Sequence, residues 1–394
     1  MSSHHVPGLW LLSLAAFCSM ASMRVCDPML VALSTEFGTS VGQASRVVSV
    51  FAVAYGCLQL FYGPLGDRIG KLRVINLAVL ACAAFSALTA AATDFELLVL
   101  ARALMGASAA GIIPLCMAWL GDQVGYERRQ ETLARLMSAT VAGMMAGQWF
   151  GGWAAQSLGW RSAFAVLSAA FALTAMLLFV RLAPQRRQAH WQTEGSYWQQ
   201  ALSGLALVRV PRVRWVLAVT ALEGALAFGT LAFVPSQLES HFGLSATLAG
   251  GLMALYGIGG LLYSQMARRW LGWFGERGLA RLGSLLVAAG LLLLAWSHAL
   301  WLAALGCLLA GLGFYMLHNT LQTQATQMAP HARGSAVTLF ACMLFFGQST
   351  GVLLTAMTVD RGGLDWTYTV AALGMVLLGG HVAGRVSALR TPPA

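Results

Sequence analysis

Charged residues are scarce in this chain. Of its 394 residues, 10% are Asp, Glu, Lys or Arg and 58% are hydrophobic, whereas about 25% of a typical soluble chain is charged. This composition excludes an ordinary soluble domain. It predicts an all-α protein that crosses a membrane many times, because one helix spans the hydrocarbon layer with about 20 apolar residues.

Motifs typical of enzymes, metal sites and ATP-driven pumps are also missing. The seven cysteines lie in apolar segments without paired-ligand spacing, which argues against a disulfide framework. No glycine-rich phosphate loop is present, and the eight histidines are dispersed. A membrane-embedded enzyme acting on lipids, the main alternative from another class, would need clustered polar groups. We therefore predict no enzymatic activity, no cofactor and no metal.

Lysine is rare, since Lys71 is the single lysine and the other basic residues are arginine. The formal net charge is nevertheless +10. In a soluble protein this charge would suggest a nucleic-acid partner, but topology explains it here and we predict no nucleic-acid binding. Most arginines fall in alternate loops, whereas the opposite loops hold Arg161 and Arg361. The positive-inside rule then predicts a multi-pass protein of the cytoplasmic (inner) membrane with both termini in the cytoplasm.

Hydropathy and turn signals predict twelve membrane-spanning helices. The predicted spans are Leu9–Leu33, Val41–Phe61, Val74–Ala92, Phe95–Leu120, Leu133–Leu158, Ser162–Val180, Val213–Leu238, Ala246–Met266, Leu279–Ser297, Leu300–Gln322, Ser335–Val359 and Thr367–Val386. A long polar stretch separates the first six from the last six. We expect an N-terminal six-helix bundle over 1–180, a cytoplasmic linker over 181–212 and a C-terminal six-helix bundle over 213–394.

The two predicted bundles resemble each other in sequence. "AYGCLQLFY" (54–62) recurs as "LYGIGGLLY" (255–263), and "GQWFG" (147–151) recurs as "GQSTG" (347–351). Between them, "YWQQALSGLALVRV" (197–210) has apolar residues at helical spacing, which predicts an amphipathic helix at the membrane surface. A duplicated unit of this kind is typical of alternating-access transporters, whose substrate site lies between the two repeats.

The connection between predicted helices 2 and 3 reads "GPLGDRIGKLR" (63–73) and resembles the signature loop of the major facilitator superfamily. The last basic position of that signature holds Leu72, which Arg73 could replace. The resemblance implies twelve helices in two pseudo-symmetric six-helix bundles. The residues that match the signature are Gly63, Asp67, Arg68, Gly70 and Lys71.

The resemblance also implies how this loop acts. Asp67 would dock against the start of helix 11, and the basic residues would meet the acid that closes helix 4, here Asp122. A carboxylate near a helix N-terminus gains roughly 0.3–1 kcal/mol, so the loop could latch one conformation. The alternative is a basic loop without a gating role.

Two more segments resemble patterns of the family. "RALMGASAAG" (102–111) is similar to its arginine-containing helix 4, and "GMMAGQWFGG" (143–152) to its antiporter signature in helix 5. Gln148 stands where that signature has proline, which weakens the antiporter interpretation. "HNTLQTQATQMAPHARGSAV" (318–337) is similar to drug and sugar efflux permeases.

Charges inside predicted spans point to a functional site, because they are costly in a bilayer. Asp27 and Arg24 share a face of helix 1, and Arg102 of helix 4 lies at a similar depth, so we expect an Asp27–Arg102 pair with Arg24 as a second partner. Burial disfavours an ionised carboxylate and a guanidinium favours it, so Asp27 could carry a proton. The alternative is a static salt bridge. Pro28 lacks an N–H, so the carbonyl of Arg24 loses its helical partner and could serve a polar site.

Further polar residues could complete the site. Glu223 lies near the middle of helix 7 without an obvious basic neighbour in sequence, and could bind a substrate cation or a second proton. Gln148 and Gln348 occupy matching places in helices 5 and 11. His318 and Asn319 add polar groups to helix 10. For each of these, hydrogen-bonded packing between helices is the alternative.

These observations predict a secondary active transporter that moves a small organic solute by alternating access, with proton-coupled efflux as the preferred direction. A proton-coupled importer or a facilitator is the alternative within the same class. The expected partners are a small-molecule substrate, protons and membrane lipids, and the expected state is a monomer.

Overall fold

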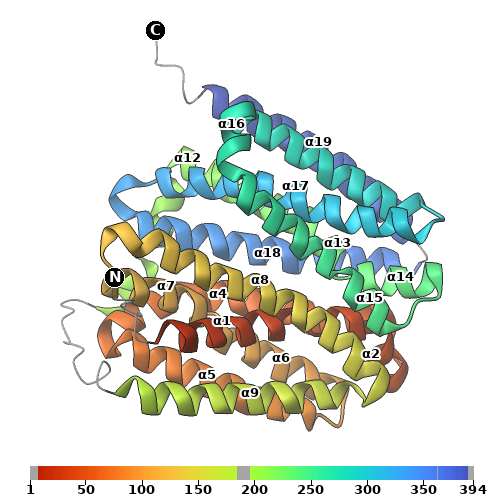
Figure 1. Cartoon of the computed structure of the whole chain (residues 1–394), viewed down its shortest axis with the longest axis horizontal. Coiled ribbons are helices and arrows are strands. Elements are labelled where there is room, and N and C mark those ends of the chain that lie inside the picture. The colour runs from red at the N-terminus through yellow and green to blue at the C-terminus, as the bar shows by residue number, and fades with distance from the viewer. Residues whose placement is uncertain (1–7, 184–195, 362, 389–394) are drawn as a thin grey trace, which may run out of the picture.

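The computed structural model describes residues 8–183, 196–361 and 363–388, and within these ranges the chain forms helices and no strand. The helices of the first half are α1 (Leu9–Arg24), η1 (Asp27–Met29), α2 (Leu30–Phe37), α3 (Val41–Ala44), α4 (Arg46–Ile69), α5 (Lys71–Ala90), α6 (Phe95–Ala109), α7 (Ile112–Gln123), α8 (Tyr126–Ser157) and α9 (Trp160–Arg181). They run roughly parallel or antiparallel to the long axis of the molecule (Figure 1).

The second half repeats this layout. Its helices, with the linker helices first, are α11 (Tyr197–Ser203), η2 (Gly204–Arg209), α12 (Pro211–Glu223), η3 (Gly224–Phe228), α13 (Gly229–Leu231), α14 (Val234–Phe242), α15 (Ala246–Leu252), α16 (Ala254–Trp296), α17 (Leu300–Gln327), η4 (Pro330–Ala332), α18 (Arg333–Val359) and α19 (Leu364–Ala388).

The number of long apolar helices fits the predicted twelve spans. Ten helical segments of the described chain are long and apolar enough to cross a membrane. One of them, Ala246–Trp296, covers 51 residues and reverses direction at Gly275, where φ is 62° and ψ is 177° (Figure 1). It therefore contains two crossings. Helix α8, with 32 residues, is not among the ten but is long enough to add one more.

The first helix of each half is interrupted near its middle. Pro28 has no N–H for the carbonyl of Arg24, and α1 ends at Arg24, with the 3₁₀ turn η1 leading into α2, whereas the sequence predicted one continuous span. In the second half, the π-helix η3 follows Glu223. A second break precedes α14, which has Pro235 in its first turn. Discontinuous helices of this kind occur at the substrate and ion sites of transporters.

Each half has its own hydrophobic core. One buried cluster is built almost entirely from residues 11–182 and another mainly from residues 213–386, and in Figure 1 the two halves lie one above the other. Residues 184–195 of the predicted linker lie outside the described part, so the boundaries of the halves stay a prediction. The predicted linker helix is present as α11 and η2, and its apolar side chains Trp198, Leu202, Leu205 and Val208 are exposed.

The sequence repeat has a structural counterpart in helix packing. Gly147 and Gly151 of α8 lie against the carbonyls of Ala21 and Val25, so close that a methyl group on either glycine would overlap them. Gly347 and Gly351 of α18 contact the carbonyls of residues 221 and 225 in the same way. The glycines and the carbonyls that they contact thus recur in the second half at the same separation along the sequence. Small residues permit this close approach of membrane helices, which explains why the "GQ" segments recur.

The molecule has two chemically different ends. The turn between α4 and α5 and the turn within α16 lie at the same end of the molecule, on the left in Figure 1. Arginines flank both turns in the sequence, so we call this the basic end. The opposite end carries the turns that follow α2, α14 and α18. Between the halves, α4 packs against α18, and α8 packs against α15 and α16.

Candidate transport site between the two halves

Asp27 is held by one partner from its own helix and one from α8. Its Oδ2 accepts hydrogen bonds from Arg24 Nη1 at 3.4 Å and from Gln148 Nε2 at 3.3 Å. Arg24 and Asp27 are 1% and 0% exposed. Asp27 Oδ1 has no hydrogen-bond partner among the described residues. This leaves a buried ion pair with one oxygen free to accept another donor.

Arg102 is placed differently from the prediction. Instead of pairing with Asp27, its guanidinium donates to the carbonyl of Ser22 at 3.0 Å and to that of Val47 at 3.3 Å, and lies 4.3 Å from the ring centroid of Phe51. Carbonyl groups near the end of α1 are available because the helix breaks there. Arg102 thus fastens α6 to α1 and α4, and Arg24 is the ion-pair partner of Asp27.

Glu223 has a partner that the sequence did not reveal. His318 Nδ1 lies 3.0 Å from Glu223 Oε2 and joins α17 to the end of α12. Glu223 is 0% exposed, His318 is 16% exposed, and Glu223 Oε1 has no partner among the described residues. Spacing along the chain could not show this pair, because the two residues meet only through helix packing.

The remaining predicted polar residues have separate surroundings. Asn319 donates to the Tyr263 hydroxyl at 2.8 Å and so ties α17 to α16, away from the Glu223–His318 pair. Gln348 is buried, and its side-chain oxygen has no partner within the described chain. The repeated glutamines therefore differ, since Gln148 binds Asp27 and Gln348 keeps an unused acceptor.

A row of aromatic rings connects the two acid–base pairs. The Arg24 guanidinium lies 4.5 Å from the ring centroid of Phe228 in η3. Phe228 contacts Phe314 at 4.6 Å between centroids, and Phe314 stacks on His318 at 5.0 Å. Phe228 and Phe314 were missed from sequence, because aromatic residues in apolar helices give no distinguishing signal. The Arg24–Phe228 contact joins the two halves at the centre of the molecule.

The signature loop differs from its predicted form. Gly63 and Asp67 lie within α4, which continues to Ile69, and the turn consists of Gly70, whose φ of 94° favours glycine. Lys71 Nζ contacts Asp122 Oδ2 at 2.5 Å, as the family resemblance implied, and Asp67 Oδ1 at 3.8 Å.

The predicted docking of Asp67 on helix 11 is absent from this conformation. Asp67 is 55% exposed, and within the described chain its ion pair is with Lys71 rather than with a group of α18. Arg68 lies over the ring of Tyr197 in the linker, at 5.5 Å, and Arg73 belongs to α5. The basic end therefore lacks the expected contact between the halves.

The opposite end holds the halves together. Asp360, at the end of α18, accepts hydrogen bonds from Ser40 Oγ at 2.6 Å and from the Gly42 N–H at 2.9 Å, both at the start of α3. Nearer the middle, the hydroxyls of Ser49 and Ser349 are 2.8 Å apart. We call the contact of Asp360 with Ser40 and Gly42 the opposite-end latch.

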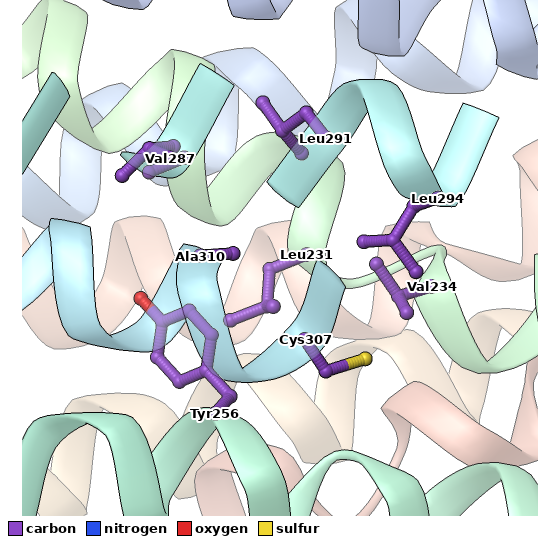
Figure 2. A pocket seen from close by; sticks show the side chains of 9 residues that line it. Leu231, Val234, Tyr256, Val287, Leu291, Leu294, Cys307 and Ala310 are labelled. Carbon is purple, nitrogen blue, oxygen red and sulfur yellow. The ribbon is translucent and has the colours of Figure 1, made fainter. Parts of the chain in front are cut away.

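A small cavity lies inside the second half rather than between the halves. Figure 2 shows Leu231, Val234, Leu291 and Cys307 around it, together with Tyr256. The Tyr256 hydroxyl is buried and has no hydrogen-bond partner among the described residues. The lining is otherwise apolar, so this cavity offers no second polar site.

Comparison with known proteins decides the family. The model of the Major Facilitator Superfamily matches residues 12–352 and 239–394. The chain belongs to the major facilitator superfamily. It is therefore a membrane transporter of a small solute rather than a member of an enzyme family.

Relatives of this major facilitator protein include transporters of known and unknown role. It is 26% identical over 364 residues to the uncharacterized transporter YgaY of Escherichia coli O157:H7, covering 90% of this chain and 89% of that protein. It is 27% identical to the chloramphenicol resistance protein of Streptomyces lividans, with the same coverage. The crystal structure of a mutant of the nucleoside transporter NupG superposes with a TM-score of 0.80 at 16% identity, covering 98% of this chain and 100% of that one, and supports the fold.

Proposed function

We propose that this protein is a proton-coupled secondary transporter that exports a small organic solute by alternating access. The observation that carries the proposal is the presence of two buried acid–base pairs, Arg24–Asp27 and Glu223–His318, one in each half. In each carboxylate one oxygen lacks a partner among the described residues. A buried carboxylate whose partner moves changes its proton affinity, which is what coupling to a proton gradient requires.

Further observations support the direction of transport and the orientation of the protein in the membrane. Similarity to a chloramphenicol resistance protein supports export of a small organic compound. The concentration of arginines at the basic end supports its location in the cytoplasm, with both termini there and the chain in the cytoplasmic membrane. We expect the protein to act as a monomer, because the site lies between the two halves of one chain.

The contacts between the halves support alternating access. The opposite-end latch is made, whereas Asp67 at the basic end is not docked on α18. We interpret this arrangement as the state closed toward the outside. In the other state the opposite-end latch would break and Asp67 would reach the start of α18. Two packings of rigid halves around a central site are the usual form of such a cycle.

The test uses purified protein in liposomes that contain a pH-sensitive dye, with a compound panel that includes chloramphenicol and nucleosides. We expect at least one compound to cause proton flux in the wild type, in the direction opposite to its own. Asp27→Asn and Glu223→Gln should each abolish uphill transport, whereas Asp27→Asn should still exchange substrate without a gradient. Glu131→Gln, an exposed acid paired with Arg135, is the matched control.

Two outcomes would contradict the proposal. Uphill transport that an added uncoupler leaves intact would reject proton coupling. Movement of compound and proton in the same direction would identify an importer and reject export.

A further inference from the structure

The short π-helix η3 connects the buried carboxylates of the two halves. It covers Gly224–Phe228, so it begins directly after Glu223 and ends with Phe228. Glu223 pairs with His318, while Phe228 lies over Arg24, which pairs with Asp27. One five-residue segment therefore follows directly on a member of one acid–base pair and contacts a member of the other. Single-turn π-helices are rare and are frequent at functional sites.

Packing ties η3 to the helix that joins the halves. A methyl group on Gly224 would overlap the carbonyl of Leu344 in α18, and one on Gly229 would lie 2.6 Å from the backbone of Gly351. Helix α18 in turn packs against α4 of the first half and carries the opposite-end latch at its end. Because packed backbones cannot slide past one another freely, a shift of η3 moves α18.

We propose that Phe228 is a positioning residue. Through its contact with the Arg24 guanidinium, it couples the protonation state of Asp27 to the position of the second half. The inference rests on the proposed proton coupling at Asp27. When Asp27 is ionised, its carboxylate attracts the guanidinium and competes with the ring for it. When Asp27 is protonated, this competition is lost and the cation binds the face of Phe228 more strongly.

The geometry determines whether protonation of Asp27 closes or opens the opposite end. Stronger binding of Arg24 to Phe228 favours the state in which α1 touches η3, which is the present state with the opposite-end latch made. Protonation should therefore close the opposite end, and deprotonation should allow it to open. For an exporter this is the useful order, because protons that enter from outside drive the empty protein back toward the cytoplasm.

Other groups near this contact could also respond to pH. Several charged or titratable side chains face Arg24 and Asp27, from the same segment and from α6, α12, α16 and α17. They are Cys26, Arg102, Glu223, Tyr256, Tyr315 and His318. Of these, Glu223 and His318 form a second pair at the far end of the aromatic row. The experiment must therefore separate their contribution from that of Asp27.

The test needs no knowledge of the substrate. Ser49, buried against Ser349 between the halves, is replaced by cysteine in a chain whose native cysteines are serine, and the protein is placed in lipid nanodiscs. The rate of reaction with N-ethylmaleimide is measured from about pH 5 to about pH 8 and divided at each pH by the rate for a cysteine at the exposed Gly272, because the reactive thiolate itself becomes more abundant as the pH rises. This ratio reports separation of α4 from α18, and we expect it to rise with pH. Phe228→Leu should reduce this rise by roughly tenfold, whereas Phe228→Trp should preserve it.

Double variants identify the source of the response. Asp27→Asn should remove the pH dependence of this ratio, and adding Phe228→Leu to it should change the ratio no further, as expected for residues that act through one contact. In a Glu223→Gln background, Phe228→Leu should keep its effect. Size-exclusion profiles and labelling of an exposed cysteine at Gly272 confirm that each variant is folded.

The outcomes distinguish this inference from the proposed function. A response that is lost in Asp27→Asn but intact in folded Phe228→Leu would overturn the role of Phe228 alone. An equal loss in Phe228→Trp would overturn it too, since the ring's volume rather than its face would then matter. A response that survives Asp27→Asn would reject Asp27 as the proton site, and with it the inference.

Discussion

The opposite-end latch gives the sharpest prediction about the conformational equilibrium. Asp360→Ala removes the acceptor for Ser40 Oγ and for the Gly42 N–H. Hydrogen bonds to a charged group are worth about 1.5–3 kcal/mol when water is excluded, but Asp360 is exposed, and exposed charged contacts contribute up to about 1 kcal/mol. With about 1 kcal/mol for the whole latch, the population open at the opposite end should rise about fivefold.

The assay is thiol labelling of Ser49→Cys in intact cells with an impermeant reagent. The matched control is Asp365→Ala, because Asp365 accepts from Gln237 at 2.7 Å near the same end but within one half. Asp360→Ala should raise the labelling rate about fivefold, and Asp365→Ala should leave it unchanged. Equal rates in Asp360→Ala and wild type would refute the reasoning.

A second variant tests the same contact by steric means. A methyl group on Gly42 would lie 2.5 Å from Asp360 Oδ2 and 2.6 Å from the carbonyl oxygen of Ala356. The carboxylate can turn away, but the backbone carbonyl cannot, so Gly42→Ala must push α3 away from α18. We expect it to increase labelling more than Asp360→Ala does.

Two other predictions concern the basic end. Asp67→Asn should lower labelling of Ser49→Cys, because Asp67 is expected to stabilise the state in which the basic end is closed; an increase would reject that role. For topology, a cysteine at the exposed Gly272 should be shielded from an impermeant reagent in intact cells, whereas one at the exposed Thr93 should react. Labelling of both positions would contradict the proposed orientation.

Much of the fold could be predicted from the sequence because membrane helices follow simple physical rules. Long apolar segments mark the spans, and the missing N–H of Pro28 marks the unpaired carbonyl of Arg24, at which the first helix ends in the structure. The repeat at residues 147–151 and 347–351 was visible because close helix contact requires glycine at fixed positions, and the structure shows why. These features depend on local sequence alone.

The site was predicted only in part, because partners across helices depend on the rotation and depth of each helix. Asp27 and Arg24 lie three residues apart and were expected to meet. The depth estimate that paired Asp27 with Arg102 was too coarse, since the guanidinium donates to the carbonyls of Ser22 and Val47 instead. The Glu223–His318 pair and the position of Phe228 depend on how α12 and η3 pack against α17 and α1, which spacing does not encode.

The α4–α18 pair has the opposite-end latch at one end and the expected contact of Asp67 with the start of α18 at the other. Because the two contacts belong to different states, each of them can be weak. The helices are antiparallel, so the end of α4 that carries Asp67 is the end that would meet the start of α18 in the other state, whereas Asp360 at the end of α18 now meets the start of α3. Only one of these contacts can be made at a time if the halves rock about the central site between them. Each latch of about 1 kcal/mol then biases the equilibrium without trapping it. A proton moving through 100 mV supplies about 2.3 kcal/mol, so under the proposed proton coupling the gradient would outweigh either contact and bias the cycle in one direction.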